Sequence, residues 1–73
     1  MNVKKVYEGQ HYEGYIIPNG EGYTGFFLHL DSGRSGYVVE FDWRAARVEK
    51  MVRGSLKVLE EYHRSMLEES SAY

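Results

Sequence analysis

The stretch YTGFFLHL, residues 23–30, is the clearest β-strand of the chain and decides its fold class. Pro, Asn and Gly within residues 18–22 supply a turn before it, and DSGRS at residues 31–35 closes it. Both faces of this strand are rich in apolar groups: one carries Thr24, Phe26, Leu28 and Leu30, and the other carries Tyr23, Gly25, Phe27 and His29. A single helix can cover only one face of a small sheet, so the pattern leaves open which face it covers.

The flanking segments predict two further strands. Residues 11–17 are rich in Tyr and Ile, and residues 36–41 contain the β-branched pair Val38 and Val39. Short turns make neighbouring strands antiparallel. We therefore expect a three-stranded antiparallel meander within about residues 3–41, in which residues 3–7 either extend the first strand or pair separately.

The residues from about 42 to 69 predict one long amphipathic helix. Asp42 is the expected N-cap, because its carboxylate can accept hydrogen bonds from free backbone N–H groups. Apolar residues recur at the helical period and continue past Gly54, which projects to the polar side. The expected fold class is α+β: a three-stranded antiparallel meander followed by one long amphipathic helix packed on one sheet face. Residues 1–73 form a single domain, with residues 70–73 as a frayed tail.

Size and composition narrow the possible functions. At 73 residues a single core contributes only about 3–5 kcal/mol, and without cysteines no disulfide can add to it. Oligomerisation is the expected support, and the lack of cysteines favours a cytoplasmic location, which is the host cytoplasm if the chain is phage-encoded. The net charge of −2 provides no general attraction for nucleic acid. We expect neither a secretion signal nor a membrane partner, because no apolar run approaches the roughly 20 residues of a membrane span.

The predicted helix is too long for the predicted sheet. At 1.5 Å per residue it spans roughly 40 Å, whereas strands of this length span about 20–27 Å. Either the chain bends near Gly54 and folds back, or a partner covers the overhang. We expect a two-fold homodimer with an interface made of residues in the second half of the helix: Leu56, Leu59, Tyr62, His63, Met66 and Leu67.

The charges of the helix favour the same antiparallel pairing. Its first half is mostly basic and its second half mostly acidic, which opposes the helix dipole. The basic residues are Arg44, Arg47, Lys50, Arg53 and Lys57, and the acidic ones are Glu60, Glu61, Glu68 and Glu69. Alternatively, these charges form the ordinary solvated side of a helix, supported by local pairs such as Glu49 with Arg53.

The sequence contains no strong motif for metal binding, catalysis or phosphate binding. His11, His29 and His63 lie on different elements without the spacing of metal ligands, so we expect no metal and no cofactor. Ser32 lies beside Asp31 in a turn that needs such residues anyway, so we expect no catalytic residue and no enzymatic activity. The match of residues 20–25 to G-x-G-x-x-G is followed by a strand instead of a helix, which excludes a phosphate-binding loop.

Binding to another macromolecule is the function that the surface residues favour. The expected partner-binding residues are aromatic or basic: Tyr23, Phe27, His29, Trp43, Arg44 and Arg47. Exposed Tyr, Trp and Arg are the usual anchors of protein interfaces, so a protein partner is the first hypothesis. The alternative is a small single-stranded nucleic-acid-binding protein, in which the sheet aromatics stack on bases and the basic start of the helix contacts phosphates.

A family resemblance adds one expectation. The runs Tyr12-Glu13-Gly14-Tyr15-Ile16-Ile17 and Gly22-Tyr23, with Gly36 and Phe41 before a helix, resemble small phage or prophage accessory proteins of β-β-β-α order. Anti-CRISPR inhibitors are among these proteins. The resemblance implies a non-enzymatic inhibitor that binds a bacterial host complex, and it assigns no site residues.

Overall fold

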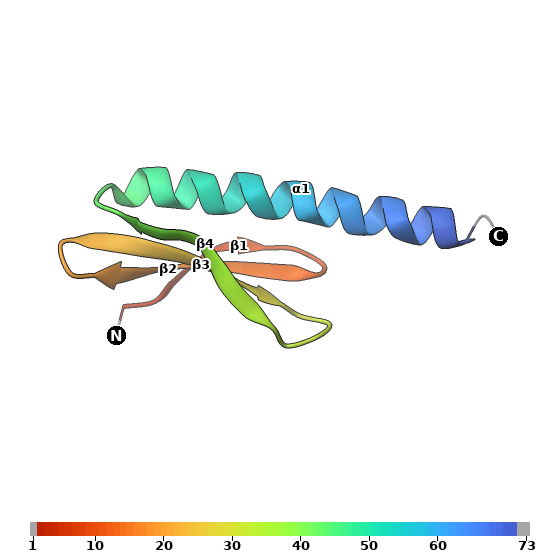
Figure 1. Ribbon diagram of the computed structural model, residues 1–73, viewed down its shortest axis with the longest axis horizontal. Coiled ribbons are helices and arrows are strands. Elements are labelled where there is room, and N and C mark those ends of the chain that lie inside the picture. Colours follow the sequence, from red (N-terminus) through yellow and green to blue (C-terminus); the bar gives the residue numbers. More distant parts are fainter. Residues whose placement is uncertain (1, 72–73) are drawn as a thin grey trace.

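The computed structural model describes residues 2–71, with side chains described as far as Met66. Its elements are β1 (Lys4–Glu8), β2 (Tyr12–Asn19), β3 (Gly22–His29), β4 (Ser35–Asp42) and α1 (Ala45–Ser71). The strands form one antiparallel sheet in the order β1-β2-β3-β4, and α1 lies along one face (Figure 1). The α+β class, the antiparallel sheet and the C-terminal helix are confirmed. The expected number of three strands is wrong, because residues 4–8 pair separately with β2 as a fourth strand.

Two glycines form the tight ends of the β-hairpins. Gly20 lies between β2 and β3 with a φ of 60°, and Gly33 lies between β3 and β4 with a φ of 75°. Residues that carry a side chain rarely adopt this left-handed backbone conformation, so both turns depend on glycine. They hold the last three strands in the register of a simple meander.

The core lies between α1 and one face of the sheet. Val48, Val52 and Leu56 are fully buried on the inner side of α1. The buried sheet residues beneath them come from three strands: Val6, Tyr12, Ile16 and Val39. Gly14 and Gly25 make room for the helix, because a Cβ atom on either would lie 2.5 Å from a Val52 methyl group. The two glycines therefore set which sheet face α1 covers.

The start of α1 corrects the expected N-cap. The first helical hydrogen bond runs from the Val48 N–H to the Arg44 carbonyl at 3.1 Å, which makes Arg44 the capping residue. Asp42 ends β4 instead, and its Oδ1 accepts a hydrogen bond from the Arg44 N–H at 2.8 Å. The carboxylate thus stabilises the turn into the helix from outside the helix, and it also pairs with Arg47 Nε at 3.4 Å.

The helix is continuous through Gly54, so the chain does not fold back there. The sheet reaches further under α1 than the strand lengths suggested, because the ends of the hairpins contact its second half. Glu60 Oε1 accepts hydrogen bonds from the backbone N–H groups of His11 and Tyr12, at 2.8 and 2.9 Å. His63 Nε2 lies 2.9 Å from the Tyr12 hydroxyl, so the helix still contacts the sheet at this position. The C-terminal part of α1 extends past the end of the sheet (Figure 1).

This packing changes the expected dimer interface. Leu56 has no exposed surface, and Leu59 packs against the core, because both lie on the inner side of α1. Leu56 therefore cannot contact a second copy. Tyr62 and Met66 remain 61% and 50% exposed, whereas the side chain of Leu67 lies outside the described residues, as does part of the expected frayed tail.

Candidate protein-binding surface

The sheet face opposite α1 carries a row of side chains, one from each strand. The strand register places Lys5 beside Tyr15, Tyr15 beside Phe26, and Phe26 beside Tyr37. Residues directly opposite in an antiparallel pair point to the same face, so three aromatic rings lie next to one another. Tyr15 and Phe26 stack with ring centroids 5.3 Å apart, and Tyr37 is 69% exposed on the edge strand. We call Tyr15, Phe26 and Tyr37 the aromatic row.

Polar groups beside the aromatic row hold Tyr15 in place. The Tyr15 hydroxyl donates a hydrogen bond to Glu13 Oε1 at 2.6 Å, which raises the pKa of Tyr15 and lowers the pKa of Glu13. Lys5 Nζ lies 3.2 Å from a carboxylate oxygen of both Glu8 and Glu13, and these contacts raise the pKa of Lys5. The cation at the end of the row is thus neutralised by two carboxylates.

A hollow of about 660 Å³ adjoins the aromatic row. Its lining comes from β2, β3 and β4: Ile17, Pro18, Asn19, Thr24, Phe26, Ser35, Gly36 and Tyr37. The Thr24 hydroxyl donates a hydrogen bond to the Glu40 carbonyl at 2.7 Å and accepts one from Asn19 Nδ2 at 3.0 Å. The Thr24 hydroxyl therefore has both a donor and an acceptor partner, and the Tyr37 ring of the lining is mostly exposed.

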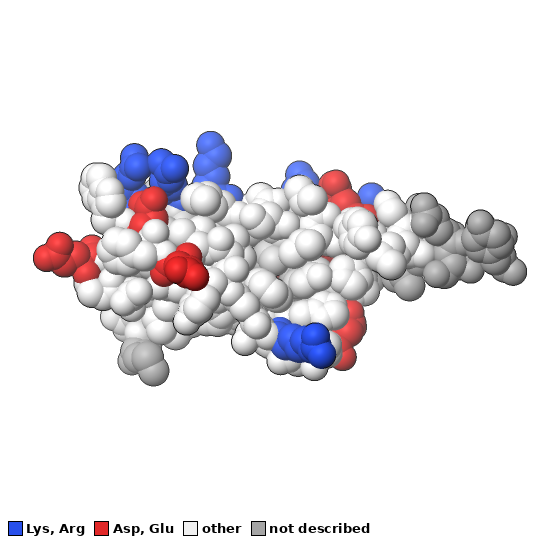
Figure 2. All heavy atoms as spheres, in the orientation of Figure 1, with Lys and Arg blue, Asp and Glu red and all other residues white. Residues whose placement is uncertain are grey.

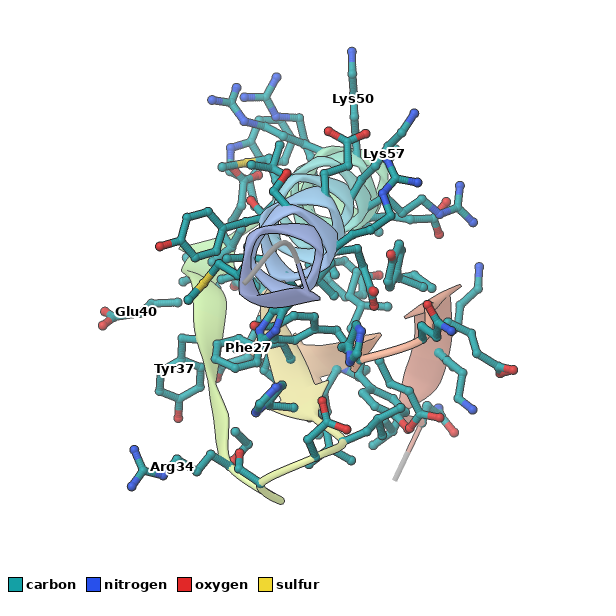
Figure 3. All side chains as sticks on the ribbon, turned by 90° about the vertical axis from the view of Figure 1, so that its right-hand side faces the viewer. Phe27, Arg34, Tyr37, Glu40, Lys50 and Lys57 are labelled. Atoms are coloured by element: carbon teal, nitrogen blue, oxygen red, sulfur yellow. The ribbon has the colours of Figure 1, made fainter. Side chains whose placement is uncertain are left out.

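The main concentration of positive charge lies on the other side of the molecule. Figure 2 shows Lys and Arg side chains gathered along the top of the first half of α1. Lys50 and Lys57 point away from the sheet, whereas Tyr37 and Arg34 lie below the helix (Figure 3). Lys50 and Lys57 therefore lie on the opposite side of α1 from Tyr37, whereas Arg34 lies on the Tyr37 side.

The predicted partner-binding residues divide into two groups. Tyr23, Phe27 and His29 lie on the face that α1 covers, where all three are half-buried, and Phe27 lies directly beneath the helix (Figure 3). We expected these three side chains to be exposed, which is wrong. Gly14 and Gly25 lie on the same face and let α1 pack closely against it.

The other predicted partner-binding residues, Trp43, Arg44 and Arg47, are exposed where β4 joins α1. The Trp43 ring is 67% exposed, and the Arg44 guanidinium carbon lies 5.0 Å from its centroid, within the range of a cation–π contact. Asp42 holds both arginines through ion pairs of 3.8 and 3.4 Å. The structure therefore places these residues at the helix start, apart from Tyr23, Phe27 and His29.

All three histidines meet between the hairpin ends and α1, although the sequence separates them widely. The His63 ring stacks on His11 with centroids 5.1 Å apart and lies 5.2 Å from His29. His11 Nδ1 lies 2.8 Å from Asp31 Oδ2, which lowers the pKa of Asp31. Among the described residues no group of three or more His, Cys, Asp or Glu side chains could hold a metal ion. The contacts of His63 with His11, His29 and Tyr12 hold the second half of α1 against the sheet.

The turn at residues 29–34 brings a serine, a histidine and an aspartate together. Ser32 Oγ lies 2.7 Å from His29 Nδ1, and His29 Nε2 lies 3.5 Å from Asp31 Oδ2. Ser32 Oγ also accepts a hydrogen bond from the Arg34 N–H at 3.2 Å, as turn serines commonly do. These contacts support the turn, and none of the three residues lines the hollow on the open sheet face.

Sequence reasoning missed Tyr15, Phe26 and Tyr37 as the aromatic set of the open face. The available signal was the pair Gly14 and Gly25, which lie on one face of β2 and β3 and mark it as the face that needs room. The histidine cluster gave no such signal, because it depends on the length of α1 and on the pairing of Tyr12 with His29.

Within the described residues, α1 is too polar to cross a membrane. Comparison of the chain with protein-family models, with curated proteins and with solved structures gave no match. The assignment of function therefore depends on the surfaces described above.

Proposed function

We propose that the chain is a non-enzymatic protein-binding module and that its partner contacts the open sheet face. The observation that carries this proposal is the aromatic row beside a hollow of about 660 Å³ on a face that no other part of the described chain covers. Tyr and Phe rings on a rigid sheet supply contact area at little cost in conformational entropy.

The charges favour a protein over a nucleic acid. Lys5 is occupied by Glu8 and Glu13, and the basic residues of α1 face away from the aromatic row. Binding of single strands needs cations along the path of the phosphates beside the stacking rings. The alternative nucleic-acid function would separate these two requirements onto opposite sides of the molecule.

The same surface fits the inhibitory role that the resemblance to small phage proteins implies. A rigid aromatic face can block a surface that a bacterial host complex needs, without any catalytic group. The hollow between β2 and β4 would receive one apolar side chain of such a partner, as anchor pockets in protein interfaces do.

Two measurements separate the hypotheses. Fluorescence polarisation with labelled single-stranded DNA and RNA at low salt should show no saturable binding. Affinity capture from an extract of the encoding organism should recover a protein with the wild-type chain and lose it with Tyr37→Ser. Saturable, salt-sensitive binding to single strands that Tyr37→Ser abolishes would contradict the proposal and support the alternative.

A further inference from the structure

A second exposed stripe lies on α1, apart from the aromatic row. Its members recur every three or four residues, so they share one side of the helix: Met51, Ser55, Val58, Tyr62 and Met66. Met51 is 42% exposed and Val58 is 64% exposed, although the neighbouring Val52 is fully buried. The stripe thus begins beside the core and continues onto the overhang beyond His63.

We infer that this stripe is the contact between two copies of the chain, paired through antiparallel α1 helices. This inference concerns a different surface from the aromatic row and does not depend on the proposed function. It replaces the interface expected from the sequence, because Leu56, Leu59 and His63 are used within the monomer.

The order of side-chain sizes along the stripe is self-complementary in one register. When two helices cross antiparallel with the two-fold axis just after Val58, between positions 58 and 59, Met51 of one copy lies opposite Met66 of the other. In the same register the small Ser55 lies opposite the large Tyr62, which leaves space for the ring. A small residue facing a large one on both sides of a two-fold axis is what a symmetric interface needs.

The charges of α1 favour a second copy over an unrelated partner. The first half of the helix is basic and the second half is acidic, so antiparallel pairing sets opposite charges side by side at both ends. The dipoles of two antiparallel helices also attract each other.

The first test is the mass of the full chain in solution, measured by light scattering at micromolar concentration. The wild type should be a dimer. Val58→Glu and Val58→Lys should each be monomeric, because each brings like charges together at the centre of the pair. A mixture of the two variants should form a heterodimer, because the charges then attract.

Lys57→Glu is the matched control, because Lys57 is also exposed on α1 but points away from the sheet, outside the stripe (Figure 3). This variant should remain a dimer. Circular dichroism should show an unchanged fold for all four chains, since both positions are exposed. A monomeric wild type, or a dimer that survives both Val58 variants, would overturn the inference.

The orientation of the helices can be tested with single cysteines, because the natural chain has none. Under mild oxidation, Met51→Cys mixed with Met66→Cys should give a disulfide-linked pair, and each variant alone should not. Efficient linkage of each variant with itself would show a parallel pair and would overturn the antiparallel arrangement.

Discussion

The two faces of the sheet differ in the size of their side chains at the level of the middle of α1. The covered face places Gly14 and Gly25 under the middle of α1, where a Cβ atom would meet Val52. The open face places the Tyr15, Phe26 and Tyr37 rings at the corresponding level. A helix can approach a sheet closely only where the side chains beneath it are small, so the two glycines select the face for packing, and the Tyr15, Phe26 and Tyr37 rings stay on the open face.

The largest loss of stability is expected for Leu56→Ala on the covered side. Removing a fully buried Leu costs about 2–5 kcal/mol, which is similar to the whole stability of a domain of this size. The variant should be largely unfolded at room temperature, as measured by circular dichroism and urea denaturation. A urea midpoint close to that of the wild type would mean that Leu56 is not a core residue.

Gly25→Ala and Gly54→Ala provide a matched pair for the glycine argument. At Gly25 the new methyl group would lie 2.5 Å from Val52, so the free energy of unfolding should fall by about 1–3 kcal/mol. At Gly54 the space is open and the backbone is helical, so the same change should raise the free energy of unfolding by up to about 1 kcal/mol. Equal effects at the two positions, measured by urea denaturation, would refute the role of Gly25 in seating α1.

Alkaline pH should lower the free energy of unfolding, because Tyr12 in the core then loses its proton. Burial, followed by the charges of Glu60 and Asp31, raises the pKa of Tyr12 in the folded chain above its ordinary value of about 10. Its contribution to stability is therefore fully present below pH 10 and is lost as the pH rises through the folded-state pKa. Urea midpoints should fall above pH 10.

Tyr12→Phe is the control for this pH dependence. The loss of stability above pH 10 should be smaller in this variant, although Tyr7 and Tyr15 also have raised pKa values and should keep part of it. An identical pH dependence in the variant and the wild type would exclude Tyr12 as a contributor.

The smallest effect on stability is expected on the open face. Tyr37→Ser removes a ring that is mostly in water, so the free energy of unfolding should change by less than about 0.5 kcal/mol. The variant should nevertheless lose the protein partner. A loss of stability similar to that of Leu56→Ala would show that the open face is a second core instead of a binding surface.

The sequence predicted the elements better than it predicted how they meet. Alternation along residues 23–30 and the helical period after residue 42 identified the strands and the helix, because both patterns are local. The sequence did not decide whether residues 4–8 form a fourth strand. This segment is short and mostly charged or polar, and its pairing depends on β2. The N-cap was placed at Asp42 because the residue type fits, although the structure uses its carboxylate to support the turn before the helix.

The candidate site was harder to predict for a physical reason. Both faces of β3 are aromatic, and only the neighbouring Gly14 and Gly25 distinguish them, through contacts that join β2, β3 and α1. The meeting of His11, His29 and His63 is likewise a product of the fold, because nothing in their spacing brings them together.

Site-specific photo-crosslinking tests the central claim most directly. A benzophenone amino acid would replace Tyr37 on the open face in one chain and Lys57 on the outer side of α1 in another, and both chains would be irradiated in an extract of the encoding organism. The aromatic row as a protein-binding surface predicts a protein adduct from position 37 and none from position 57. An adduct only from position 57, or an adduct of position 37 with nucleic acid, would contradict it.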